Sequence, residues 1–402
     1  MRDVCEVQTS LMFSSRIHCM IRKKHSLLSF FVLATVLLSA CQPQPPTPDS
    51  DAVMTQAVQT AFASIQLTKP AATPTKLPLP TPTLPLTPPA LPATFATSVL
   101  NPLDTPHTYI DDACQYLKAK WTSTNAMPGT MVLIVMFHGI EKGTITDPNQ
   151  ISVHDFNQLM NSLHNQNFTA ISMQQMMDFM YNNAKIPARS VLLIQDDRHS
   201  AQNFTDHFLP FYKQWGWPVT NGWISAFGGT DPVLAENVAL SKQGWISYQA
   251  HGVIHNIIIT SDSTNEFMLS ELQGSINNIQ QYFGTTPIAY IWPGGGFTPK
   301  AVQLARQVGY KLGFTINPRG PVMFNWVPQA DQIDPQRPLL IPEGPASDPL
   351  MTLPRIWDVD AQQHLGTFVA IGDAAVAYAQ KNKAVEMQYY NIVCAAKDGP
   401  IP

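Results

Sequence analysis

The segment Val191-Leu192-Leu193-Ile194-Gln195 is an apolar run that ends in two acidic residues, Asp196 and Asp197. An earlier run, Met131-Val132-Leu133-Ile134-Val135-Met136-Phe137, likewise ends at a polar residue, His138. Short, nearly unbroken apolar runs are typical of strands that are buried on both faces, as in parallel sheets. Both segments are therefore predicted to be strands of one parallel sheet.

Helical patterns alternate with further strand-like runs between these segments and beyond them. We expect helices over residues 110–121, 155–166, 173–182, 204–215, 231–243, 268–283 and 299–308, and strands over 169–171, 219–225, 245–248, 288–291 and 312–316. This alternation predicts an α/β fold, a parallel sheet or barrel with its helices outside. In such folds the chemistry gathers at the carboxyl ends of the strands, where His138, Asp196 and Asp197 fall.

The composition predicts one folded domain behind a long tether. The net charge is −4, only 13% of the residues are charged, and no basic stripe suggests a nucleic-acid surface. Residues 42–106 are rich in Pro and Thr and are predicted to be a disordered linker, since prolines cannot sustain helix or sheet hydrogen bonding. We expect a domain over 107–360, a helical extension over 361–402 packed on it, and a monomer.

Residues 1–41 read as an export signal. Arg22-Lys23-Lys24 precedes an apolar stretch over 27–38, and Leu38-Ser39-Ala40-Cys41 resembles the lipobox of bacterial lipoproteins. We expect translation to start at Met20 and Cys41 to be lipidated, which would place the protein outside the cytoplasm on a bacterial membrane. A transmembrane anchor or an ordinary cleaved signal is the alternative.

Two cysteines of the exported chain remain besides Cys41. Cys114 and Cys394 stand near the beginning and the end of the predicted domain. Outside the cytoplasm they could form a disulfide, because domain termini often lie close together. Two buried free thiols are an equal alternative, since the sequence does not give the Cα separation.

The acidic pair gains meaning from two histidines downstream, His251 and His255. A carboxylate and two imidazoles are a common ligand set for Zn²⁺, and a second carboxylate next to the first is free to accept a proton. Taken singly, each piece has a simpler interpretation. The aspartates could cap a helix, the histidines could share a solvated helix face, and His138 could be a core residue.

Six separated pieces in order favour the chemical interpretation. They are Met136-Phe137-His138-Gly139-Ile140, Leu193-Ile194-Gln195-Asp196-Asp197, His251-x-x-x-His255, Trp292-Pro293-Gly294-Gly295, the stretch 308–315 and Leu353-Pro354-Arg355-Ile356. Together they resemble the polysaccharide deacetylase family with the NodB-type domain, over residues 131–357. The likeness is greatest to the branch with a first-strand Phe-His or Tyr-His pair, which includes the poly-N-acetylglucosamine deacetylases. It implies a distorted (β/α)7-type barrel and metal-dependent deacetylation.

The resemblance also implies roles for individual residues. Asp196 corresponds to the catalytic base, and His138 to the acid that protonates the departing amine. Asp197, His251 and His255 correspond to the metal ligands, which leave a position open for water, as catalytic zinc sites do. The expected metal is Zn²⁺, with Co²⁺ and Ni²⁺ as alternatives. A backbone N–H near Trp292, in the turn Trp292-Pro293-Gly294, would bind the negative oxygen of the intermediate.

Several positions depart from the family pattern. Gln195 and Arg198 flank the acidic pair where relatives have Phe and Gly, and Ile291 stands where many relatives have an Arg that orients the base. Arg198 and Arg355 are the candidates to replace that Arg. Gly252 lacks the hydroxyl that relatives carry after the first metal-binding His.

Three other side chains near these motifs have two interpretations. Trp292 and Trp326 could stack on sugar rings or fill the core. His199 is a rival ligand or acid, with a surface role as the simpler interpretation.

The resemblance thus implies a hydrolase of linear amides. We expect it to remove N-acetyl groups, or alternatively O-acetyl groups, from a cell-wall or extracellular polysaccharide. The first alternative is a deacetylase-like glycan-binding protein with little or no turnover. A glycoside hydrolase ranks last, because adjacent aspartates on one strand point to opposite sides and cannot flank a sugar bond.

Overall fold

The computed structural model describes residues 87–226, 230–254 and 257–402. They belong to a compact unit that spans Leu84–Pro402. The predicted signal, its lipidation site Cys41 and most of the predicted linker lie outside the described residues. Among the helices that are described, none is both long enough and apolar enough to cross a membrane.

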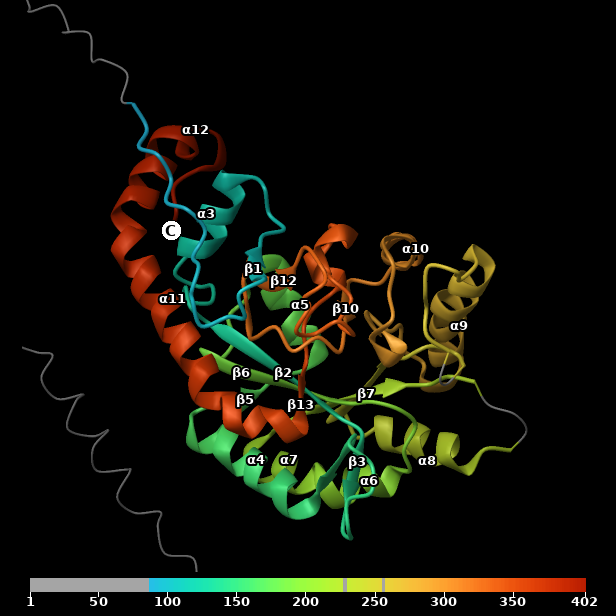
Figure 1. Cartoon of the computed structure of the whole chain (residues 1–402). Coiled ribbons are helices and arrows are strands. Elements are labelled where there is room, and N and C mark those ends of the chain that lie inside the picture. Colours follow the sequence, from blue (N-terminus) through green and yellow to red (C-terminus); the bar gives the residue numbers. More distant parts are fainter. Residues whose placement is uncertain (1–86, 227–229, 255–256) are drawn as a thin grey trace, which may run out of the picture. The chain divides into compact units, whose positions relative to one another are not determined.

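A curled sheet of parallel strands forms the centre of the unit (Figure 1). In spatial order the strands are β10 (Leu312–Phe314), β9 (Ala289–Ile291), β8 (Ile246–Ala250), β7 (Val219–Trp223), β6 (Arg189–Gln195) and β2 (Met131–Phe137). Each strand pairs in parallel with the next. This confirms the α/β fold predicted from the alternation, and the barrel is an incomplete one.

The strands are buried on both faces, as their unbroken apolar sequences predict. In β2, Leu133 and Val135 belong to one hydrophobic cluster, whereas Val132 and Ile134 belong to another. The second cluster also contains Phe314 from β10, at the opposite end of the strand order. Side chains of β2 and β10 can share a cluster only if the sheet curls.

Helices lie around this sheet and beyond one of its ends (Figure 1). They are α3 (Ala113–Trp121), α4 (Val153–Asn165), α5 (Met173–Asn182), α6 (Ala201–His207), α7 (Leu209–Trp215), α8 (Pro232–Ser241), α9 (Asn265–Phe283), α10 (Pro299–Val308), α11 (Asp358–Val393) and α12 (Ala395–Asp398). Helix α3 begins three residues later than predicted because Asp112 is its N-cap, whose side chain accepts hydrogen bonds from the backbone N–H groups of Cys114 and Gln115.

A single segment crosses the gap between β10 and β2. Leu353 forms a bridge with Phe314 at the end of β10, and β13 (Ile356–Trp357) pairs in parallel with Val135 and Met136 of β2. The approach to β10 is close, because a Cβ atom on Gly313 would lie 2.1 Å from the carbonyl oxygen of Met351. Residues 353–357 therefore bridge the gap between the two edge strands of the incomplete barrel.

The predicted linker ends too late. Residues Asp104–His107 form β1, which pairs antiparallel with β12 (Val327–Ala330), and Leu100 is buried. Pro106 is tolerated because β1 is one of only two strands in its small sheet, where a proline at an edge removes little hydrogen bonding. The folded domain thus begins before residue 100 rather than at 107.

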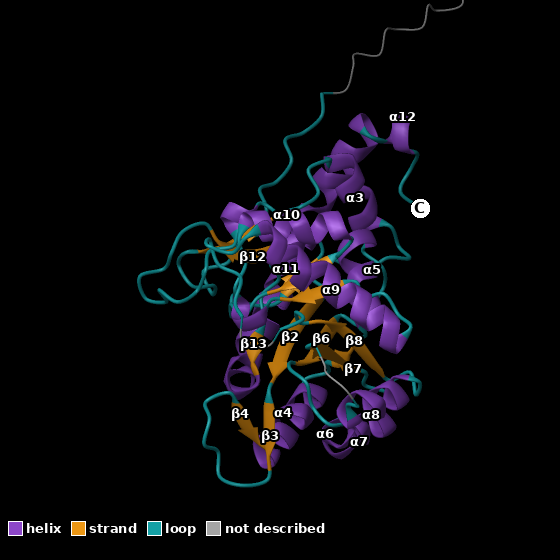
Figure 2. Cartoon of the chain, turned by 90° about the vertical axis from the view of Figure 1, so that its right-hand side faces the viewer, coloured by secondary structure: helices purple, strands orange, loops and turns teal. Residues whose placement is uncertain are grey.

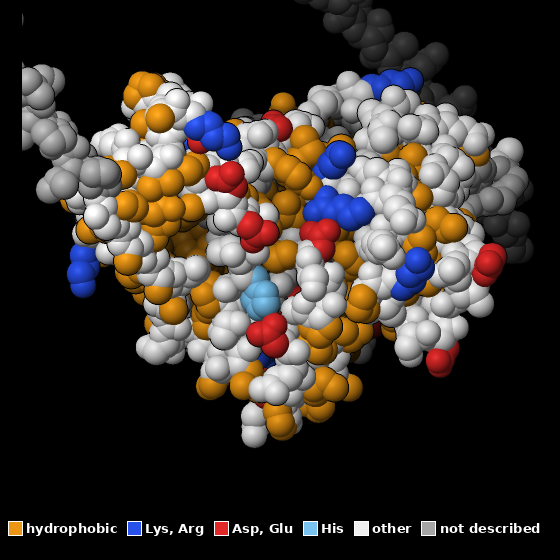
Figure 3. Space-filling model, turned by 90° about the horizontal axis from the view of Figure 1, so that it is seen from above, with side chains coloured by type: hydrophobic (Ala, Val, Ile, Leu, Met, Phe, Trp, Pro, Cys, Tyr) orange, Lys and Arg blue, Asp and Glu red, His pale blue; other side chains and the backbone are white. Residues whose placement is uncertain are grey.

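The two ends of the sheet differ (Figure 2). Strand β2 runs toward the ribbon of β3 (Gly139–Glu141) and β4 (Gln150–Ser152), while α3 and α12 lie at the other end. The small strands β5 (Thr169–Ala170) and β11 (Val322–Met323) pair with β6 and β2. On the face seen in Figure 3, basic side chains are scattered among acidic ones.

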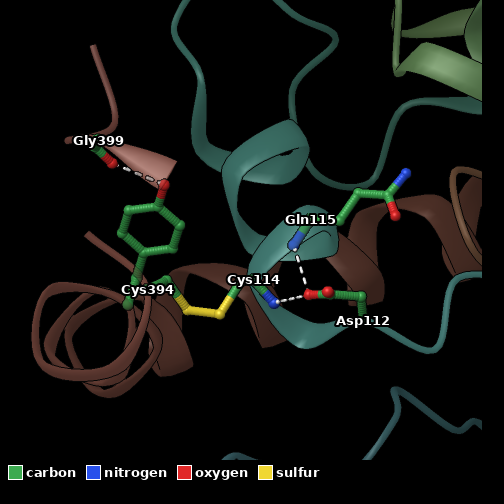
Figure 4. Close-up of a disulfide and its surroundings, with 6 residues drawn as sticks. Asp112, Cys114, Gln115, Cys394 and Gly399 are labelled. Carbon is green, nitrogen blue, oxygen red and sulfur yellow. Dashed lines mark hydrogen bonds between the residues drawn. A yellow bond between two sulfur atoms is a disulfide. The ribbon is translucent and has the colours of Figure 1, made fainter. Parts of the chain in front are cut away.

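Cys114 and Cys394 form a disulfide at the end marked by α3 and α12 (Figure 4). Their Cα atoms are 5.4 Å apart, within the usual range for this bond. The bridge joins the first helix of the domain to the end of α11. The sequence left this pairing and two free thiols equally open, and the structure has the disulfide.

Candidate functional site

Asp196 and Asp197 stand at the carboxyl end of β6, in the middle of the sheet. The backbone N–H of Asp196 still donates to the carbonyl of Phe137 at 2.8 Å, whereas Asp197 turns into the left-handed region with φ 67°. Asn221 of β7 holds this turn, because its Nδ2 donates to the carbonyls of Gln195 at 2.7 Å and Asp197 at 2.9 Å. The positive φ falls on Asp197, so Arg198 fits where relatives have Gly.

Arg355, and not Arg198, orients Asp196. Its Nη1 lies 2.6 Å from Oδ1 and 2.8 Å from Oδ2 of Asp196, and its Nε donates to the carbonyl of Thr315 at 2.7 Å. Arg355 is completely buried on the segment that closes the barrel. Its position therefore depends on that closure.

Arg198 is engaged elsewhere. Its Nη1 donates to the carbonyl of Ala226 at 2.7 Å, its guanidinium pairs with Asp231, and it lies 4.8 Å from the centre of the Trp223 ring. Of the two arginines considered from the sequence, the structure brings only Arg355 to the acidic pair.

The charge of Asp196 follows from its surroundings. Burial raises the pKa of this carboxyl, but Arg355, His251 and His138 together outweigh burial and hold the pKa below its usual value. Asp196 is consequently ionised at neutral pH, the state that a general base requires.

His138 follows β2 and faces the same carboxylate. Its Nε2 is 3.6 Å from Oδ2 of Asp196, and its ring stacks on Trp357 with the ring centres 5.1 Å apart and the planes at 15°. Burial lowers the pKa of His138 more than Asp196 raises it, so the imidazole is neutral at neutral pH. The stack fixes the ring while Nε2 points at Asp196.

Sequence analysis did not single out Trp357. Arg355 and Trp357 are two residues apart on an extended segment, so their side chains point to the same side. This two-residue spacing could have pointed to Trp357, because an extended segment that directs Arg355 toward the acidic pair directs Trp357 to the same side.

His251 and Asp197 form the second half of the site. His251 is buried, its Nδ1 is 2.8 Å from the carbonyl oxygen of Ile291, and its Nε2 is 3.6 Å from Oδ1 of Asp197. Nδ1 must carry the proton in order to donate to a carbonyl, so Nε2 is the nitrogen that faces Asp197. A histidine held in this way by a backbone carbonyl is typical of metal ligands.

The electrostatics at His251 also favour a cation. Burial lowers the pKa of this imidazole, yet Asp196 and Asp197 raise it above the usual value. The third predicted ligand, His255, lies outside the described residues. Within the described part of the chain, no three His, Cys, Asp or Glu side chains form a group that could hold a metal ion.

Trp292 and Trp326 fill the core, which is one of the two interpretations that the sequence left open. The Trp292 ring is completely buried with its Nε1 donating to the carbonyl of Met351 at 2.8 Å, and its backbone N–H donates to Phe314. This N–H is therefore not available to an oxyanion, because the parallel ladder continues one residue past β9. Trp326 is buried too, so neither ring stacks on a sugar.

The turn after Trp292 stays near the site. Pro293–Gly295 form the 3-10 turn η1, in which Pro293 is buried and Gly294 is exposed with φ 55°. Pro293 lies against the residue that follows His251, since a Cβ atom on Gly252 would be 3.2 Å from its Cγ. Gly294 is the exposed member of the predicted oxyanion turn.

Gln195 and His199, which flank the acidic pair in the sequence, contact each other beside it. The Gln195 Nε2 is 2.9 Å from the His199 Nε2, and Gln195 also donates to the carbonyl of His138. The imidazole nitrogen must then accept, and burial lowers the pKa of His199, so this ring is neutral. His199 is thus engaged by Gln195, which occupies the Nε2 that a ligand or acid would use.

Part of this site lies in a segment of the chain that is similar to a known family. Residues 183–313 match the family model described as polysaccharide deacetylase. The chain carries a polysaccharide deacetylase domain. The match includes the acidic pair and His251, whereas His138 and Arg355 lie outside its limits and are brought to the deacetylase site by the fold. The family is one of hydrolases that act on amide bonds.

Several solved structures are similar to part of the chain. A deacetylase from Streptococcus pyogenes, PplD, in complex with acetate is 20% identical, covers 60% of this chain and 99% of its own, and gives a TM-score of 0.46. IcaB from Ammonifex degensii is 15% identical, covers 60% and 98%, and gives 0.45. A putative polysaccharide deacetylase from Bacillus anthracis is 17% identical, covers 60% and 69%, and gives 0.44. No curated protein matches the chain.

Proposed function

We propose that this protein is a metal-dependent deacetylase that removes N-acetyl groups from a cell-wall or extracellular polysaccharide. The observation that carries the proposal is the grouping of one oriented carboxylate, Asp196, between Arg355 and His138, beside the pair of Asp197 and His251. One half of the site suits proton transfer and the other suits a metal ion.

The residues present fit a divalent metal. Asp197 and His251 converge with Oδ1 and Nε2 facing each other, and Nδ1 of His251 is already engaged by a carbonyl. With His255 as the predicted third ligand, they would hold Zn²⁺, or Co²⁺ or Ni²⁺ in its place. When bound, such an ion supplies Lewis-acid polarisation of the acetamide carbonyl and lowers the pKa of the attacking water.

The remaining chemistry belongs to the side chains. Asp196, ionised and fixed by Arg355, accepts a proton from the attacking water. His138 Nε2 faces Oδ2 of the same carboxylate at 3.6 Å and is placed to exchange that proton and deliver it to the departing amine. Because the resting imidazole is neutral, the proton that it delivers must first reach it from Asp196.

The proposal includes a place for the protein in the cell. The disulfide between Cys114 and Cys394 supports export, because such bonds persist in oxidising compartments. Attachment to a membrane through a lipid on Cys41 remains a prediction from the sequence, and so does the monomeric state.

The test is acetate release from N-acetylated chito-oligosaccharides by the purified protein. We expect activity with Zn²⁺ or Co²⁺, its loss on chelation, and its return when metal is added. The surface variant Asp373→Asn should behave as wild type, since this side chain is 65% exposed. Bound metal without acetate release from N-acetylated or O-acetylated substrates would contradict the proposal and favour a glycan-binding protein.

A further inference from the structure

A buried carboxylate on α9 lies behind the metal-binding half of the site. Glu271 is 1% exposed, and its Oε2 accepts hydrogen bonds from the backbone N–H groups of Val253 at 2.7 Å and Ile254 at 3.1 Å. Oε1 is buried without a partner in the described part of the chain. Burying a carboxylate costs free energy unless its hydrogen bonds compensate, and here these bonds go to the turn that follows His251.

The same turn is held from its other side. The carbonyl of Gly252 accepts from the backbone N–H of Ser225 at 3.1 Å, and the carbonyl of Val253 accepts from Ala226 at 2.8 Å. Residues 252–254 are thus fixed between the extension of β7 and the carboxylate of Glu271, directly after His251.

Gly252 and Glu271 fit each other sterically. Gly252 has φ 77°, and a Cβ atom on it would lie 2.8 Å from Oε2 of Glu271 and 3.6 Å from the hydroxyl of Tyr290. A contact under 3.0 Å forces atoms to shift, and the left-handed backbone already disfavours a side chain. The carboxylate therefore occupies the space that a side chain at 252 would need.

We propose that Glu271 is a positioning residue for the metal site, and that Gly252 is required because Glu271 takes this role. Glu271 reaches neither metal nor substrate. It acts through the backbone of residues 253 and 254, which fixes the direction in which the chain leaves His251. The inference rests on the proposed function only where it treats His251 as a metal ligand.

Two measurements test separately whether Glu271 holds residues 253 and 254 and whether this strengthens metal binding. Amide hydrogen exchange of Val253 and Ile254 in the metal-free protein measures how firmly Glu271 holds these two N–H groups. Competition with a chromophoric chelator measures the affinity for Zn²⁺. In Glu271→Ala we expect faster exchange at both amides and a roughly 10- to 100-fold weaker affinity, as is typical when hydrogen bonds that surround a metal site are removed.

Two further variants sharpen the test. Glu271→Gln keeps an oxygen that can accept both N–H groups, so it should lose less affinity than Glu271→Ala. Gly252→Ala should weaken Zn²⁺ binding by at least roughly 10-fold, and it decides the matter if Glu271→Ala does not fold. The matched control is Glu266→Ala, an exposed glutamate on the same helix, which should bind Zn²⁺ as wild type does.

The possible failures are distinct. If folded Glu271→Ala, or Gly252→Ala in its place, binds Zn²⁺ as tightly as wild type, Glu271 does not position the metal site. If the wild-type protein binds no Zn²⁺, the proposed function fails, and the exchange rates alone then decide whether Glu271 holds the turn.

Discussion

The two ends of the barrel treat their buried polar groups differently. At the end of α3 and α12, Lys120 pairs with Glu386 at 2.8 Å, Trp121 donates to the same carboxylate at 2.7 Å, and a disulfide joins the helices. At the carboxyl ends of the strands, His138 Nδ1, Gln195 Oε1, Asn221 Oδ1 and Arg355 Nη2 are buried without partners in the described residues.

This difference indicates that one end of the barrel serves catalysis and the other serves stability. Buried polar atoms without partners cost free energy, so a protein carries several of them together mainly where function requires it. We therefore expect substitutions at the strand ends to reduce activity most, and substitutions at the disulfide end to reduce stability most.

The largest effect is expected for Arg355. Replacing it by Ala leaves the buried Asp196 without the guanidinium that contacts both of its carboxylate oxygens, which should lower kcat by at least roughly 100-fold and reduce the free energy of unfolding by roughly 3–5 kcal/mol. Acetate release and urea unfolding measure the two effects. Arg198→Ala is the matched control, and equal activity losses in the two variants would contradict the assignment of Arg355.

Loss of the disulfide should reduce stability and leave activity unchanged. Cys114→Ser with Cys394→Ser opens a loop of 280 residues, which should lower the free energy of unfolding by up to about 5 kcal/mol. Well below the unfolding temperature, kcat should stay at the wild-type value. A fall in kcat at unchanged stability would show that the two ends are coupled.

A smaller effect is expected from Asp358, the first residue of α11. Burial raises its pKa from 3.8 to about 7. The folded protein then binds a proton that the unfolded chain releases, so the free energy of unfolding should fall by up to roughly 4 kcal/mol as pH rises from 4 to 8. Asp358→Asn should flatten this dependence in thermal unfolding, whereas Asp373→Asn should keep it.

The sequence predicted the frame of the fold well. The strands at 131–137 and 191–195 were predictable because burial on both faces leaves unbroken apolar runs. The end of the linker was not, because the edge strand β1 contains Pro106 and resembles the Pro-rich segment before it.

The site was predictable only in part. The acidic pair and the histidines follow from motifs, but the choice between Arg198 and Arg355 depends on a segment 159 residues away that closes the barrel. The sequence left two interpretations of Trp292 open, because the neighbours that bind its N–H and its indole are revealed only by the folded chain. Glu271 gave no signal, since its partners are backbone groups.

The two aspartates of the acidic pair are assigned different roles, Asp196 as the base and Asp197 as a metal ligand. Zn²⁺ affinity and acetate release would be measured for Asp196→Asn and Asp197→Asn. We predict that Asp196→Asn keeps near wild-type affinity but loses roughly 10²- to 10⁴-fold in kcat, while Asp197→Asn loses both. If Asp196→Asn loses its metal, or Asp197→Asn retains it, the assignment of base and ligand is wrong.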